Sequence, residues 1–83
     1  MAVTFEDMRV VETHVADLRA GLEPKLPVML STEYDRVDID ARKLDGRTAG
    51  DLADALAQSL GRKGYPWDVW VATDGRMVHV AER

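Results

Sequence analysis

The sequence predicts a small α+β fold, in which two helices pack on a four-stranded mixed or antiparallel sheet in the order α-β-β-α-β-β. Two segments predict helices, because their apolar residues recur every three or four positions. Two other segments predict β-hairpins, because apolar and polar residues alternate on either side of a short loop. Residues 1–83 are few enough to predict one small domain.

The first helix is expected after Thr4, which stands three residues before Asp7 as in a capping box. Gly21 and Pro24 are expected to end it. Core packing of its apolar stripe is the interpretation we prefer to a dimer zipper, because the stripe covers only about two heptads. The stripe consists of Met8, Val11, Val15, Leu18 and Leu22, widened by Phe5 and Val10.

The first hairpin is expected to begin near Val28, with residues 32–35 as its loop. One face is then apolar, whereas the other carries Arg36, Asp38 and Asp40 and is expected to be solvated. Pro27 favours the edge of the sheet for the first strand. The predicted register pairs Ser31 with Arg36, Leu30 with Val37, Met29 with Asp38 and Val28 with Ile39.

The second helix is expected to begin at Thr48, where Asp51 repeats the capping arrangement, and to stop at Gly61. Its stripe is narrow and rich in alanine, so the helix can lie close to a sheet. As a crossover it makes the strand before it parallel to the strand after it. The stripe consists of Ala49, Leu52, Ala53, Leu56 and Leu60.

The second hairpin is expected from Trp67 to Arg83, with Asp74 and Gly75 in a type I′ turn. Both of its faces are apolar, although small soluble sheets usually leave one face polar. The face opposite the valines therefore needs a cover, either a helix or a partner. The predicted register pairs Thr73 with Arg76, Ala72 with Met77, Val71 with Val78, Trp70 with His79, Val69 with Val80, Asp68 with Ala81 and Trp67 with Glu82.

Composition narrows the classes of function. With 11 basic against 15 acidic residues, the net charge of -4 lacks the positive field that drives non-specific binding to nucleic acids. The chain has no cysteine, no apolar run long enough to span a bilayer and no secretory leader, so we expect a cytoplasmic protein without disulfides. Residue usage favours a GC-rich genome, that of an actinobacterium or one of its phages.

No catalytic or metal-binding motif is recognised. Across the strand from Trp70, His79 has Asp68 diagonally nearby, but packing or partner contact explains it more simply than catalysis. We interpret His14 as packing at the core boundary. The group Asp35, Asp38 and Asp40 does not match a calcium loop. Phosphate loops, nucleophile elbows and dinucleotide fingerprints are missing, so we expect a protein that is not an enzyme and has no cofactor or metal.

Two hypotheses of function remain. In the first, the chain is a protein-binding module that uses Trp70, Met77, His79 and Ala72, with a homodimer as the simplest arrangement and another protein as the alternative. If the helices divide between the two sheet faces, these residues are ordinary core. In the second, a small regulator binds nucleic acid through the basic edge of Arg42, Lys43, Arg47 and Arg76. Asp45, Asp51 and Asp74 lie at that edge and weaken its field.

Overall fold

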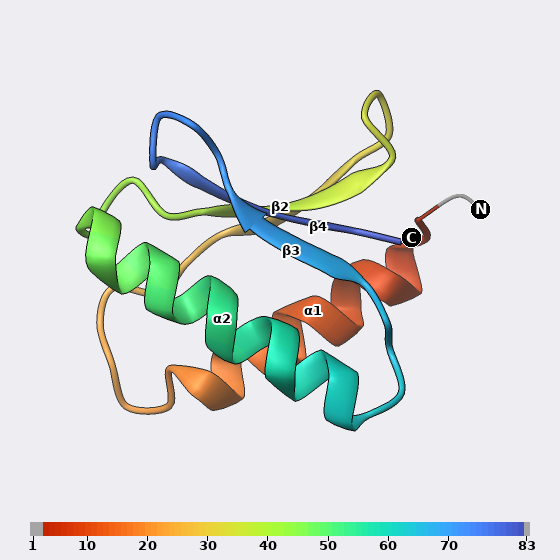
Figure 1. Ribbon diagram of the computed structural model, residues 1–83, viewed down its shortest axis with the longest axis horizontal. Helices are drawn as coiled ribbons and strands as arrows, with labels where there is room; N and C mark the ends of the chain where they lie inside the picture. The colour runs from red at the N-terminus through yellow and green to blue at the C-terminus, as the bar shows by residue number, and fades with distance from the viewer. Residues whose placement is uncertain (1–2, 83) are drawn as a thin grey trace.

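The computed structural model describes residues 3–82, which form two helices and one four-stranded sheet (Figure 1). The predicted order of elements is confirmed. The elements are α1 (Phe5–Leu18), β1 (Val28–Ser31), β2 (Arg36–Asp40), α2 (Gly46–Arg62), β3 (Asp68–Val71) and β4 (Met77–Ala81).

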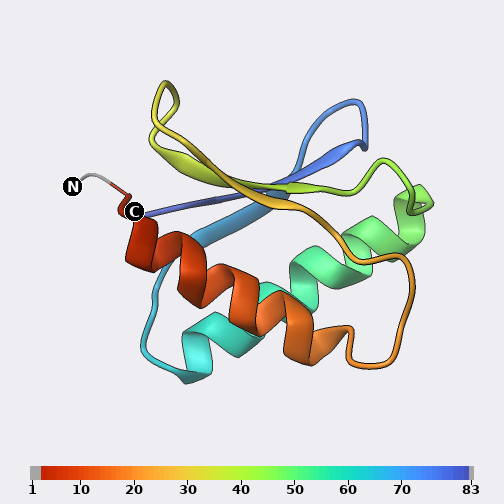
Figure 2. The same ribbon diagram turned by 180° about the vertical axis from the view of Figure 1, so that it is seen from behind.

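The sheet has the strand order β1-β2-β4-β3, and every neighbouring pair is antiparallel. The helix α2 connects β2 to β3, and these two strands point the same way. They do not pair with each other, because β4 lies between them. The sheet is therefore antiparallel and not mixed. Both helices cover the same face of the sheet, as the two opposite views show (Figures 1 and 2).

The predicted register is confirmed within the strands of both hairpins, whereas the predicted pairs Thr73–Arg76 and Trp67–Glu82 lie outside the ladder. In the first hairpin, Val28 pairs with Ile39 and Ser31 with Arg36. In the second, Trp70 pairs with His79, and the ladder extends from Asp68 to Val71. Alternation of apolar and polar residues sets this register, because a slip by one residue would move every valine to the wrong face.

The helix-covered face of the sheet carries the core. Val37, Ile39, Val78 and Val80 are at most 1% exposed and pack against the stripes of both helices. All five stripe residues predicted for α2 are buried. The core cluster consists of Val11, Val15, Val37, Ile39, Ala41, Ala49, Ala53, Leu56, Leu60, Val78 and Val80.

The predicted capping box of α1 is present: Asp7 N donates to Thr4 Oγ1, and Thr4 N donates to Asp7 Oδ2. The helix ends at Leu18, earlier than the apolar spacing suggests, and the chain turns at Gly21 with φ +77°. Because Leu22 follows this turn, it is 57% exposed and lies outside the stripe. Phe5, at the first helical position, is 60% exposed and does not widen the stripe either.

The ends of α2 differ from the prediction. Its N-cap is Asp45, whose carboxylate accepts a hydrogen bond from Thr48 N at 2.7 Å, so Thr48 lies inside the first turn. The helix continues past Gly61, and the left-handed residue that turns the chain is Gly64, with φ +86°. An aspartate cap and a left-handed glycine satisfy the free backbone groups at the two ends.

The turn of the second hairpin is not type I′. Of the central pair, Gly75 alone has a positive φ, +73°, whereas a type I′ turn needs one at both residues. Gly75 N donates to Ala72 O, which makes Thr73 and Asp74 the central residues of the turn. Ala72 N in turn donates to Met77 O at 2.8 Å, so the longer loop keeps the predicted register.

The two αββ halves of the chain are related by an approximate two-fold axis perpendicular to the sheet. Adding 41 to a residue number in the first half gives its counterpart: the N-cap Thr4 becomes Asp45, and the pair Met29–Asp38 becomes Trp70–His79. The pairing of β2 with β4 obeys the same rule, because Val37–Val80 maps onto Val78–Ile39. Asp38 and His79 map onto each other, so the axis passes between them.

Candidate functional site

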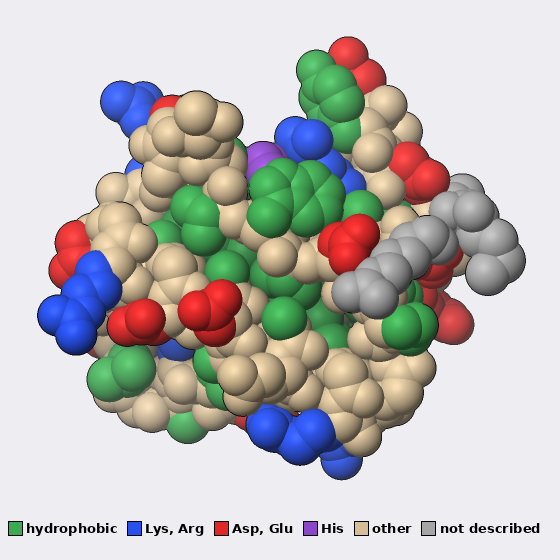
Figure 3. All heavy atoms as spheres, viewed as in Figure 1, with side chains coloured by type: hydrophobic (Ala, Val, Ile, Leu, Met, Phe, Trp, Pro, Cys, Tyr) green, Lys and Arg blue, Asp and Glu red, His purple; other side chains and the backbone are tan. Residues whose placement is uncertain are grey.

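The sheet face that the helices leave uncovered, called the open face below, combines side chains from all four strands. Its central row follows the strand order across the sheet: Met29, Asp38, His79 and Trp70. The tips of the two hairpins, residues 32–35 and 73–76, rise at opposite ends of this face (Figure 1). The space-filling view shows a hollow between the two tips, with apolar side chains visible in it (Figure 3).

The centre of the open face is a compact polar group. His79 Nδ1 lies 2.7 Å from Asp38 Oδ1, and Arg36 Nε donates to the same oxygen at 2.9 Å. The indole of Trp70 lies against the imidazole, with 5.4 Å between ring centroids. His79, one of the contact residues of the protein-binding hypothesis, is only 7% exposed. Neighbouring side chains on the same face bury it.

Apolar side chains flank this polar centre on both edge strands. Met29 on β1 is 43% exposed and Trp70 on β3 is 41% exposed, at positions that the approximate two-fold axis relates. Tyr34 in the β1–β2 tip is 61% exposed, and its ring lies 4.6 Å below the guanidinium carbon of Arg36. The open face therefore presents two apolar lobes, Met29 on β1 and Trp70 on β3. Between them lies the hydrogen-bonded group of Arg36, Asp38 and His79.

Of the four predicted contact residues, the structure places all on the open face, but with different exposure. Trp70 is exposed, Met77 and Ala72 are half-buried and His79 is buried. Sequence reasoning left out Met29, which the predicted register had placed on the outward face of the first hairpin. The missing information was the pairing of β2 with β4, which joins the outward faces of the two hairpins into one surface.

The basic edge is assembled by a contact between two loops, because Ala41 N donates to Arg76 O at 2.8 Å. Arg42 is held by Asp40, with Nη2 2.7 Å from Oδ2. Hydrogen bonds from the Arg42 side chain lower the pKa of Asp40, and the same bonds raise the pKa of Arg42. Lys43, Arg47 and Arg76 are exposed.

Carboxylates occupy the same edge. Asp45 caps α2, and the hydrogen bond from Thr48 N lowers the pKa of this carboxyl. The side chain of Asp74 accepts a hydrogen bond from Arg76 N at 3.0 Å. The backbone contact joins the loop of Arg42 and Lys43 to Arg76, and Arg47 follows in the first turn of α2, but carboxylates offset much of the charge at this edge.

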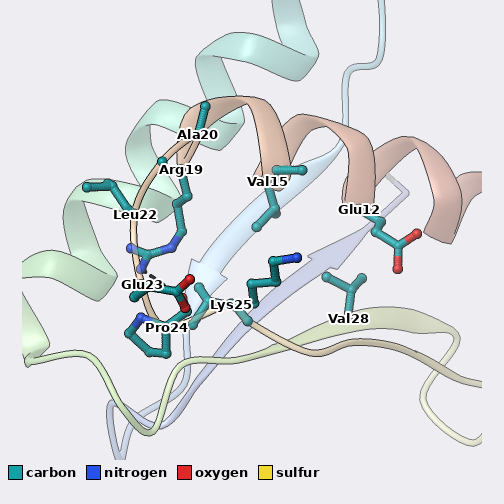
Figure 4. Close-up of a pocket in the computed structure, with 12 residues that line it drawn as sticks. Glu12, Val15, Arg19, Ala20, Leu22, Glu23, Pro24, Lys25 and Val28 are labelled. Carbon is teal, nitrogen blue, oxygen red and sulfur yellow. Dashed lines mark hydrogen bonds between the residues drawn. The ribbon is translucent and has the colours of Figure 1, made fainter.

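A pocket that the sequence did not predict lies between α1, β1 and the segment that joins them (Figure 4). Its volume is about 450 Å³, and its walls are mainly apolar, with Val15 and Val28 on opposite sides. The Arg19 guanidinium closes one end, donating from Nη2 to Pro24 O at 3.0 Å. The lining carries equal numbers of basic and acidic side chains: Arg19, Lys25, Glu12 and Glu23.

His14 forms a contact between the two helices, away from the open face. His14 Nδ1 lies 2.6 Å from Ser59 Oγ and the ring meets Tyr65 edge-on, which joins α1 to α2 and the segment after it. Within residues 3–82, no three His, Asp or Glu side chains are grouped so that they could hold a metal ion. The helices described are all too short or too polar to cross a membrane.

Comparison of the chain with protein-family models, with curated proteins and with solved structures finds no match, so its function has to be inferred from the open face and the chemistry around it.

Proposed function

We propose that the protein is a small, non-enzymatic protein-binding module and that its open face is the contact surface. One observation carries the proposal. Both helices lie on the valine face, so Trp70 and Met29 remain more than 40% exposed on a sheet face that nothing in residues 3–82 covers. Tryptophan and methionine are enriched in protein interfaces, and exposed apolar patches on small proteins mark such surfaces.

The polar centre favours binding because it is already ordered. Asp38 holds both Arg36 and His79, and the Trp70 ring lies against His79. Side chains that are fixed before binding lose little conformational entropy when a partner docks. An exposed indole on a rigid base is the kind of residue that contributes most to binding energy.

The same geometry favours a non-enzymatic role. A catalytic imidazole must reach its substrate, whereas His79 is 7% exposed beneath Trp70 and its Nδ1 lies on Asp38. We extend the proposal to a cytoplasmic location, with which the absence of cysteine agrees.

Nucleic-acid binding through the basic edge is the alternative, and the charges there support it less well. Asp40 already neutralises Arg42, while Asp45 and Asp74 stand beside the remaining basic side chains. Binding to phosphates would give a gel shift that weakens with salt and disappears when Arg42, Lys43, Arg47 and Arg76 become alanine. We expect no shift even at low salt, and a salt-sensitive shift would favour the alternative.

The proposal is tested by capture experiments with extracts of the source organism. We expect the wild type to retain a protein that the double variant Trp70→Ser, Met29→Ser does not retain. The matched control is Phe5→Ser, Leu22→Ser, which removes apolar side chains that are even more exposed from α1 and the segment after it. The captured protein is then purified and its affinity measured with all three chains. If no protein, this chain included, binds in a way that depends on the open face, the proposal is wrong.

A further inference from the structure

We infer that the partner of the open face is a second copy of this chain, docked face to face with its strands roughly aligned. This inference rests on the proposed function and names the partner at the same surface. Three properties of the described residues support it: the approximate two-fold symmetry of the face, its curvature and its size.

Symmetry distributes the apolar contacts evenly. Met29 and Trp70 are exposed to almost the same extent, 43% and 41%, at equivalent positions on the two edge strands. The axis passes between Asp38 and His79 at the centre. A partner with the same arrangement meets both lobes alike, whereas a partner with one apolar patch would engage one lobe and leave the other in water.

Curvature makes the face complementary to itself. An antiparallel sheet twists, and the two raised hairpin tips belong to opposite edges of the sheet as well as to opposite ends of the strands, so the face is a twisted saddle that is hollow between the tips (Figures 1 and 3). When such a face is turned over about an axis along its strands, it keeps the same twist, and each raised corner of one copy meets a low corner of the other. Packing of two twisted sheets with their strands within about 30° of each other is a known arrangement.

In this arrangement each hairpin tip of one copy lies over an edge strand of the other. The β1–β2 tip carries Tyr34, which is 61% exposed. Face-to-face docking brings such a tip over the end of β1 or β3, the strands that carry Met29 and Trp70. The polar centres then face each other as compensated groups, because Asp38 already pairs with Arg36 and His79. Apolar contact is therefore made by the tips and edges rather than by the centre.

Size indicates a weak, reversible dimer. Figure 1 views the open face from the side, so the extents of the whole molecule along its longest and shortest axes, 32 Å and 17 Å, set an upper limit on the face. A rectangle of 32 × 17 Å has an area of about 540 Å², below the roughly 800 Å² per partner of standard stable complexes. We therefore expect a dissociation constant of about 10 μM to 1 mM.

Sedimentation velocity over a range of about 10 μM to 1 mM tests the inference. The mean mass of the wild type should rise towards twice that of the monomer, and the control Phe5→Ser, Leu22→Ser should behave in the same way. The variant Trp70→Ser, Met29→Ser should remain monomeric, with a circular dichroism spectrum that verifies its fold. A wild type that is monomeric throughout overturns the inference, and so does a face variant that dimerises like the wild type.

A second measurement needs no change to the apolar lobes. Because the chain has no cysteine, Glu33→Cys in the β1–β2 tip takes a single spin label. The labelled chain is mixed with unlabelled, ¹⁵N-enriched protein, and amide signals are recorded. We expect intermolecular broadening in residues 28–31 or 68–71, the edge strands. Broadening confined to α1 or α2, or none at about 1 mM, contradicts the face-to-face arrangement.

The two proposals fail in different ways. If the wild type is monomeric but another protein is captured in a Trp70-dependent and Met29-dependent way, the second-copy inference is wrong and the protein-binding function stands. If neither self-association nor capture depends on the open face, both are wrong.

Discussion

Asp38 and His79 occupy equivalent positions in the two halves of the chain, 41 residues apart, and meet at the centre of the open face with 2.7 Å between Oδ1 and Nδ1. In a homodimer, the two equivalent residues that meet at the two-fold axis would be identical. In this single chain the two positions have different residues, an acid and a base. The central contact is therefore an acid–imidazole pair, which two identical residues would not provide.

Removing the central carboxylate should destabilise the fold. In Asp38→Ala, His79 Nδ1 and Arg36 Nε lose their partner where the two side chains are only 9% and 24% exposed. We expect the free energy of unfolding to fall by about 1–3 kcal/mol, measured by urea denaturation. Asp54→Ala, at an exposed position on α2, is the control and should change stability by less than about 0.5 kcal/mol. Equal effects of the two substitutions would contradict this role of Asp38.

The boundary of the core can be tested with two leucines of the helical layer. Leu56 is fully buried, so Leu56→Ala should cost about 2–5 kcal/mol through lost burial and the cavity left behind. Leu22 is 57% exposed beyond the end of α1, and Leu22→Ala should cost less than about 0.5 kcal/mol. Chemical denaturation of both variants gives the comparison. A large loss for Leu22→Ala would mean that α1 extends its stripe to this residue in solution.

The cap of α2 predicts a defined dependence on pH. The hydrogen bond from Thr48 N lowers the native pKa of Asp45 below its usual 3.8, so its stabilising effect is present above about pH 4 and is lost as the pH falls through the native pKa. Asp45→Asn keeps a capping oxygen but does not titrate. We expect the wild type to lose stability relative to Asp45→Asn below about pH 4, measured as urea midpoints along a pH series.

Two further variants complete this experiment. Asp45→Ala removes the cap and should lower the urea midpoint at pH 7. Asp51→Ala, at the residue that the sequence pattern assigned to a capping box with Thr48, should leave the midpoint nearly unchanged because Asp51 is exposed on the helix. A larger loss for Asp51→Ala than for Asp45→Ala would instead indicate that Thr48 is the N-cap.

Glu82 should destabilise the fold at neutral pH. Desolvation and the nearby Asp7 raise its pKa above the usual 4.5, so its native state favours the protonated form. This contribution to stability is present below pH 4.5 and is lost as the pH rises through the native pKa. Glu82→Gln should therefore have a higher urea midpoint than the wild type at pH 7, and the advantage should shrink near pH 4.

The control for this prediction is Glu23→Gln, which removes the same charge at an exposed position after α1. A change in net charge alone would raise both midpoints equally. A higher midpoint at pH 7 for Glu82→Gln alone would assign the effect to the local environment of Glu82.

The element order and both hairpin registers were predictable from the sequence because they follow from local patterns. One face of the first hairpin carries Val28 and Leu30, and one face of the second carries Val69 and Val71. A register shifted by one residue would move these apolar side chains out of the core. The helix stripes followed from spacing in the same way. The exact caps did not, since Asp45 and Thr48 are both good capping residues and only the path of the preceding loop selects one.

The open face was decided by tertiary structure. Local alternation places Met29 on one hairpin and Trp70 on the other, but it does not say that β2 and β4 pair or that both helices cover the valines. Those outcomes depend on contacts between residues about 40 positions apart, which short-range patterns do not contain. The sequence by itself therefore determined which side chains share a face within each hairpin, and the packing of the halves determined that these faces form one surface with His79 buried at its centre.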